Sequence, residues 1–199
     1  NNEDIKERQL PNQTRGLVGG GRGGSPVAPL DSIDLITIAT LGNASDFGDL
    51  SNVRMGAGAL ASPTRALFIG GSHSPATPST FYASIDRVEI ATAGDASDFG
   101  DMTVARVNGG AVNSPTRGVM CSGQKGPSVA RDNTIDFVTI ASAGNATDFG
   151  DITVARRGAA SASSNTRGVI AGGIDQPSAK NTIDYITICL LYTSPSPRD

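Results

Sequence analysis

The chain has 199 residues, including 25 Gly and 11 Pro but no Trp, which is enough for one medium-sized domain. Its 16 Lys and Arg against 19 Asp and Glu give a net charge of −3, too small to make nucleic acid or an anionic membrane the main partner. No apolar stretch reaches the roughly 18–20 residues of a membrane helix. With Cys121 and Cys189 as the only cysteines, a disulfide framework is excluded.

A unit of about 50 residues recurs along the chain and governs its organisation. Each of the three whole units carries a Thr-Arg pair, an Ile-Asp pair, an Asp-Phe-Gly-Asp motif and a closing arginine. The spacing divides the chain into a remnant of a preceding repeat at 1–13, unit 1 at 14–63, unit 2 at 64–115, unit 3 at 116–165 and a partial unit 4 at 166–188.

The repeat breaks off after Ile188, where residues 189–199 replace the expected continuation. This tail resembles the conceptual translation of a sequencing-library adapter, and a divergent final repeat is the alternative. We therefore leave the tail out of the fold reasoning. Without Arg198 and Asp199 the charges become 15 against 18, and the net charge is still −3.

Two strands are predicted in the first half of each unit. After the Thr-Arg pair comes a short apolar run ended by glycines, such as 67–71, which is typical of a strand buried on both faces. The segment that follows the variable loop alternates, with Val88 and Ile90 on one side and Arg87 and Glu89 on the other. This period of two predicts a strand with one buried face.

Two further strands are predicted in the second half. The Asp-Phe-Gly-Asp motif is expected to form a turn, and a strand is expected to run from this turn through 102–106. The stretches 55–62, 107–114 and 157–164 consist almost entirely of Gly, Ala, Ser and Asn, with Arg157 among the few exceptions. Such small side chains let backbones approach closely, as in the innermost strand of a radial fold. Helix signals are poor throughout.

This order of strands resembles the kelch repeat, one blade of a β-propeller, over residues 14–188. The resemblance implies an all-β fold: a partial kelch-like β-propeller of about 3.5 four-stranded blades of about 50 residues each. A continuous β-solenoid is the alternative fold. Two features depart from the family pattern: the third-strand Tyr appears only at Tyr185, and the usual Trp is replaced by Phe47, Phe99 and Phe149.

Nucleotide-binding motifs are present only in form. Gly19-x-Gly21-x-x-Gly24 matches the dinucleotide fingerprint, but the Ser-Pro-Val-Ala-Pro sequence that follows starts no helix to hold a pyrophosphate. We interpret these glycines as the end of a strand. The Asp-Phe-Gly motif occurs without the other kinase motifs and in every whole unit, so a kinase is excluded.

The acidic motif also suggests a calcium loop, because Asn43, Ser45, Asp46 and Asp49 place oxygen donors close together. Phe47, however, occupies a position where such a loop needs an oxygen ligand. The alternative that we favour is a turn capped by Asp, with Gly at positive φ and Phe packed between units. No metal site is predicted.

An enzyme with its site in this chain is not expected, and no cofactor is predicted. A kelch-type copper oxidase would need several His ligands, and the chain has His73 alone. Sialidase-like boxes would need Trp, which is absent. Cys121 aligns with Gly19, Ile69 and Ala171, so a small buried role is favoured over a nucleophile.

Arginines and aspartates that recur in every unit are first explained by what every unit needs, which is hydrogen bonds and ion pairs to its neighbours. A charged binding ring is the alternative. The residues concerned are Arg15, Arg65, Arg117 and Arg167 with Asp34, Asp86, Asp136 and Asp184.

The connection between the second and third strands varies from unit to unit, which on a rigid scaffold is typical of a binding protein. Drift in unconstrained surface loops is the alternative. The side chains best suited to hold a glycan or a peptide are His73, Phe81, Tyr82, Lys125, Arg131 and Lys180.

The sequence therefore predicts a non-catalytic recognition module that contacts a protein or a glycan through these loops, with the remaining blades of its parent chain as further partners. The repeats are similar to those of marine viral and microbial sequences, which suggests a source. A virion or extracellular surface is the expected location of such a module. The alternatives are a structural spacer of a virion or extracellular array, and a fragment of a propeller enzyme whose active site lies elsewhere.

Overall fold

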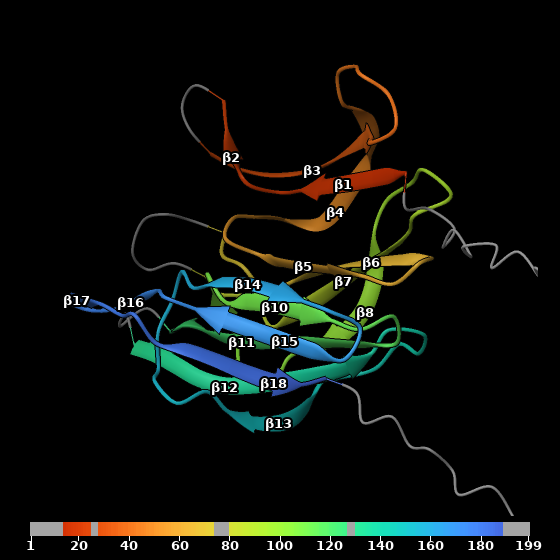
Figure 1. The fold of residues 1–199 in the computed structure, drawn as a ribbon. Helices are drawn as coiled ribbons and strands as arrows, with labels where there is room; N and C mark the ends of the chain where they lie inside the picture. Colours follow the sequence, from red (N-terminus) through yellow and green to blue (C-terminus); the bar gives the residue numbers. More distant parts are fainter. Residues whose placement is uncertain (1–13, 25–27, 74–79, 127–129, 189–199) are drawn as a thin grey trace, which may run out of the picture.

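The computed structural model describes residues 14–24, 28–73, 80–126 and 130–188, and all regular elements within them are β-strands (Figure 1). The prediction of an all-β fold is confirmed. Within these ranges no helix has the length and apolar character to cross a membrane. The predicted remnant at 1–13 and the adapter-like tail at 189–199 lie outside the described residues.

The strands form consecutive antiparallel sheets, one for each repeat of the sequence. Sheet 1 contains β1 (Arg15–Gly19), β2 (Arg22–Gly23), β3 (Ala28–Thr37) and β4 (Ser45–Arg54). Sheet 2 contains β5 (Gly58–Ala61), β6 (Arg65–Ile69), β7 (Ser84–Glu89) and β8 (Ser97–Asp101). In sheet 2 each strand pairs with the next along the chain, as a meander.

Sheets 3 and 4 follow the same plan. Sheet 3 contains β10 (Gly110–Asn113), β11 (Arg117–Lys125), β12 (Ala130–Thr139) and β13 (Thr147–Asp151), and β9 (Arg106–Val107) pairs with the end of β11. The described part of sheet 4 contains β14 (Ala160–Ser163), β15 (Arg167–Ala171) and β18 (Ile183–Thr187), and a separate hairpin is formed by β16 (Ile174–Asp175) and β17 (Ser178–Ala179).

The register is the same in all four sheets. Leu67 of β6 lies opposite Arg87 of β7, and the corresponding residues are paired in the other sheets: Leu17 with Leu35, Val119 with Phe137, and Val169 with Tyr185. The small-residue strand is the first strand of its sheet and pairs with the apolar strand that follows it. Each of these sheets therefore takes its first strand from the end of the preceding sequence unit.

The core lies between neighbouring units rather than within one of them. Phe47 of β4 packs with Phe68, Val88 and Ile90 of unit 2, and Phe99 of β8 belongs to a similar cluster with residues of unit 3. Because each sheet is covered by its neighbour, a single unit cannot bury its own apolar faces. The predicted position of Phe between units is confirmed for Phe47 and Phe99.

The Asp-Phe-Gly-Asp motif is a strand and not the predicted turn. It forms β8, β13 and the first half of β4. The strand predicted to follow it is present in unit 1, where β4 continues to Arg54, but 102–105 of unit 2 is not a strand. Two Asp and a Gly carry little strand propensity, but the backbone here is held by long-range contacts. Phe99 is an extra residue in the β7–β8 ladder, so that the strand is bulged. The predicted positive φ is confirmed, at +142° for Gly100.

The small-residue strands lie side by side, and β10 contacts both β5 and β14. Asn113 Nδ2 donates to the carbonyl of Ala61 in β5 (2.7 Å), and Ser161 Oγ of β14 donates to the carbonyl of Ala111 (2.9 Å). Larger side chains here would separate the backbones. The composition of these stretches is therefore explained by close approach of three strands.

Candidate functional site

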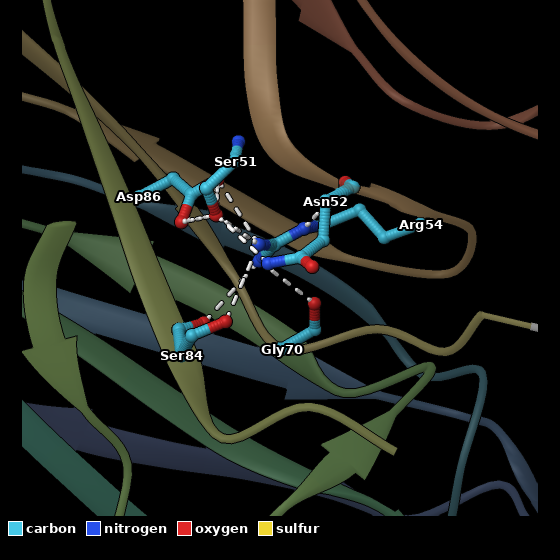
Figure 2. Close-up of polar contacts among 6 residues, drawn as sticks. All are labelled: Ser51, Asn52, Arg54, Gly70, Ser84 and Asp86. Carbon is cyan, nitrogen blue, oxygen red and sulfur yellow. Dashed lines mark hydrogen bonds and ion pairs between the residues drawn. The ribbon is translucent and has the colours of Figure 1, made fainter. Parts of the chain in front are cut away.

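The closing arginine of unit 1 lies in a buried polar cluster with unit 2 (Figure 2). Arg54 Nη2 is 3.0 Å from Asp86 Oδ2, and both side chains are almost completely buried. Arg54 also donates to the carbonyls of Gly70 and Ser84 (3.2 and 3.3 Å), while the amide and hydroxyl of Ser51 donate to the Asp86 carboxylate, each at 2.8 Å.

The same pair recurs at the next two interfaces with different neighbours. Arg106 bridges two buried carboxylates, Asp132 at 3.0 Å and Asp136 at 2.9 Å. Arg156 is 2.8 Å from Asp184. Burial alone would raise the pKa of Asp184, but hydrogen bonds from Thr153 and Arg156 and the charge of Arg156 outweigh burial and leave this pKa below its ordinary value.

A second recurring arginine joins the units at the opposite end of the strands. Arg15 Nη1 donates to the carbonyl of Ile90 (2.8 Å), and Arg65 and Arg117 donate to the carbonyls of Ile140 and Ile188, the equivalent residues of the next units. The structural interpretation of the recurring charges is confirmed for these arginines and for Asp86, Asp136 and Asp184.

These clusters are suited to stability rather than to chemistry. Buried charges that are paired with each other inside the protein are not accessible to a ligand. Among the described residues, no group of three or more His, Cys, Asp or Glu is placed to hold a metal ion. A candidate binding site must therefore lie elsewhere.

The variable connections leave the same end of every sheet, because the register is shared. Figure 1 shows β2 and the β16–β17 hairpin at this end, on the left. His73 is exposed there, and Phe81 is half-buried and forms an isolated bridge with Ser72. Parts of these connections, at 25–27, 74–79 and 127–129, lie outside the described residues.

Tyr82, Lys125 and Lys180 are tied to the framework. The Tyr82 ring lies 5.3 Å from the Arg54 guanidinium, and its backbone amide donates to the carbonyl of Gly71. Lys125 Nζ is 3.0 Å from Asp132 Oδ1, on the same carboxylate that pairs with Arg106. Lys180 Nζ is 3.5 Å from Asp175. Each of these side chains has a structural partner as well as some exposure.

Arg131 belongs to a cationic cluster that the sequence did not indicate in full. Arg131 Nη1 and Arg157 Nη1 both donate to Gln124 Oε1, at 3.4 and 2.7 Å. Burial, and then the charge of Arg157, lowers the pKa of Arg131, and the nearby Asp175 opposes this shift. Gln124 and Arg157 were not predicted as site residues. The only sequence signal for Arg157 was that it is a charged residue in a stretch of small residues, 157–164. We call Gln124, Arg131 and Arg157 the arginine cluster.

The arginine cluster joins two units. Gln124 and Arg131 belong to the variable connection of unit 3, whereas Arg157 forms a bridge with Ile174 at the start of the connection of unit 4. Of the six predicted ligand residues, Arg131 belongs to this cluster, whereas Lys125, on the neighbouring strand, pairs with Asp132 instead. His73 and Phe81 belong to the connection of unit 2, and Lys180 to that of unit 4.

Cys121 is fully buried in β11, and burial raises the pKa of its thiol to about 12. A thiol in this state is not a nucleophile near neutral pH. The small buried role expected for Cys121 agrees with this position.

No protein-family model matches the chain, and no curated protein does either.

Proposed function

We propose that the chain is a non-catalytic recognition module, a partial kelch-like propeller whose variable connections bind a protein or glycan partner. Two features support this proposal: most of the recurring charges take part in contacts between units, and the connections that differ emerge together at one end. We expect such a module to act at a virion or extracellular surface.

The observation that carries the proposal is the arginine cluster at this end. Two guanidinium groups from different units converge on one amide oxygen, and both side chains are half-buried rather than fully covered. Asp175 lies near enough to offset part of the charge of Arg131, so the guanidinium that is left for an anionic partner is that of Arg157. Among the described residues, Arg157 forms no ion pair with a carboxylate.

The chemistry of the cluster defines the partner. Guanidinium groups bind carboxylates and sulfates through paired hydrogen bonds, which gives orientation as well as affinity. We therefore expect an acidic group on the partner, as in a uronic acid, a sialic acid or an acidic side chain. His73 and Phe81, on the connection of unit 2, would contact the remainder of such a partner.

The test is binding of the purified chain to an array of acidic glycans and their neutral analogues, followed by cell-surface proteins. We expect binding to acidic ligands, and a loss of at least tenfold in affinity for Arg157→Gln. Arg87→Gln is the matched control, because Arg87 lies on β7 and donates to Ser97 instead. Binding to neither set, or equal binding by Arg157→Gln, would contradict the proposal and favour a structural spacer.

A further inference from the structure

One surface of unit 1 is exposed although its counterparts in the other units are buried. Val18, Ile36 and Ile38 are 55%, 40% and 64% exposed. The residues at the same positions of unit 2 are buried, with exposures of 2% for Phe68, 4% for Val88 and 6% for Ile90, and those of unit 3 are buried too: Met120, Val138 and Ile140. We call Val18, Ile36, Ile38 and Asp34 the unit 1 face.

The unit 1 face carries an unmatched charge. Asp86, Asp136 and Asp184 are each buried and paired with the closing arginine of the preceding unit. Asp34 has the same place in the repeat but is exposed, and no arginine pairs with it among the described residues. A partner for this face should therefore bring a guanidinium group together with apolar side chains.

Backbone groups at the edge of this face are also unmatched. In unit 2 the amides of Gly94 and Ala96 donate to the carbonyls of Phe47 and Asp49, each at 2.7 Å. The same contacts join the turn of unit 3 to Phe99 and Asp101 of unit 2. The corresponding amides of unit 1, at 42 and 44, have no such partner within the described residues.

A cavity lies beside the edge of β1 that has no paired strand among the described residues. It has a volume of about 260 Å³ and is lined by β1 and β5, including Leu17, Ala59 and Ala61. In sheets 2, 3 and 4 the apolar strand pairs with a small-residue strand at this edge. In the described part of sheet 1, β1 pairs only with β3. The cavity therefore lies where such a strand is found in the other units.

We propose that the unit 1 face and the free edge of β1 bind a further repeat of this same kind. That repeat would supply a closing arginine for Asp34, a Phe for Ile36 and Ile38, carbonyls for the amides at 42 and 44, and a small-residue strand for β1. A single occupant thus satisfies the apolar, charged and backbone groups, and each contact has a counterpart at the other interfaces. The proposal does not depend on what the variable connections bind.

The test extends the chain by one repeat. Residues 1–13 are replaced by a copy of 64–115, which ends as unit 2 does before its following Thr-Arg pair. We expect hydrogen exchange at the amides of Gly42 and Ala44 to slow by at least tenfold in the extended chain. The control extension carries Ala at the positions that correspond to Phe99 and Arg106, and it should give little protection. Equal protection by both extensions, or by neither, would overturn the proposal.

A second measurement uses the original chain, in case the extended one fails to fold. Asp34→Ala should leave the unfolding midpoint unchanged, whereas Asp86→Ala should lower it clearly. Equal losses would show that the face is already occupied and would overturn the proposal. Sedimentation of the original chain tests a second copy as the occupant: a dimer that Asp34→Arg abolishes would also overturn it.

Discussion

The interfaces between units and the variable connections at the end of the sheets differ in whether their residues and contacts recur from unit to unit. At the interfaces the same residue types recur in the same contacts, as in Arg54 with Asp86 and Arg106 with Asp136. In the connections neither length nor residue type recurs, and the charged groups meet in arrangements found once among the described residues, such as Arg131 and Arg157 on Gln124.

This difference separates stability from recognition. Residues that recur every 50 positions satisfy the needs of a stack of sheets, and a change in one of them should alter unfolding more than binding. Residues of the connections face solvent at one end, so that a change there should alter binding more than unfolding. Each prediction below tests one side of this comparison.

The largest effect is expected for Arg106→Met. Loss of the guanidinium leaves Asp132 and Asp136 buried without their shared partner, and the free energy of unfolding should fall by about 3–5 kcal/mol. Denaturant unfolding followed by circular dichroism measures this change. Arg87→Met is the control, since Arg87 lies at the surface and its loss should change stability by less than about 0.5 kcal/mol. Similar losses in both variants would show that the buried pairs contribute nothing special.

A pair of glycine variants sharpens the comparison within one motif. A Cβ at Gly100 would lie 2.4 Å from the carbonyl oxygen of Gly144 in the next unit, whereas a Cβ at Gly150 meets nothing within 4 Å among the described residues. Both glycines have positive φ, +142° and +131°. We expect a loss of about 2–4 kcal/mol for Gly100→Ala from strain and overpacking together.

For Gly150→Ala strain alone remains, and the expected loss is about 1–2 kcal/mol. Thermal unfolding of the two variants side by side measures the difference. A larger loss for Gly150→Ala than for Gly100→Ala would contradict the explanation that glycine is needed at position 100 for the close approach between units.

Ser122→Gly should stabilise the chain. Ser122 has a φ of +60° and a fully buried hydroxyl without a hydrogen-bond partner, at a position where the other units have Gly20, Gly70 and Gly172. Removing the left-handed strain and the unsatisfied oxygen should raise the free energy of unfolding by about 1 kcal/mol. The midpoint of denaturant unfolding measures the gain, and a lower midpoint would contradict the prediction.

The smallest effect concerns pH. The pKa of Asp184 is below its ordinary value of 3.8 in the folded chain, so its charge stabilises the fold above that value and this contribution is lost as the pH falls through the lower, folded pKa. Asp184→Asn should therefore be less stable than the native chain at neutral pH, with a difference that shrinks in acid. Melting temperatures between pH 2.5 and 7 measure this trend, and a constant difference would contradict it.

Local patterns in the sequence predicted the strands well where the burial of apolar side chains determines the secondary structure. The apolar run at 67–71 overlaps β6 and the alternation at 87–90 overlaps the end of β7, because burial favours the same residues in any sheet. The Asp-Phe-Gly-Asp strand was missed because its backbone is fixed by amides of the next unit, about 45 residues away. The spacing of motifs along the sequence does not show such backbone contacts between units.

The candidate site was predicted only in part for a similar reason. Arg131 and Lys125 stood out as charged residues of a variable connection. Gln124 and Arg157 did not, because their importance comes from the bridge between units 3 and 4, which brings residues 33 positions apart into hydrogen-bonding distance. Tyr82 was predicted as a ligand residue and also contacts the buried Arg54.

The central claim is that recurring charges hold neighbouring units together, and a double-mutant cycle between Arg54 and Asp86 tests it most directly. We expect Arg54→Met and Asp86→Asn to show a coupling of at least about 2 kcal/mol in the free energy of unfolding, because both groups are buried and paired across an interface. The same cycle on the exposed pair of Arg65 and Glu89 should give less than about 1 kcal/mol. Additive losses at Arg54 and Asp86 would contradict the account.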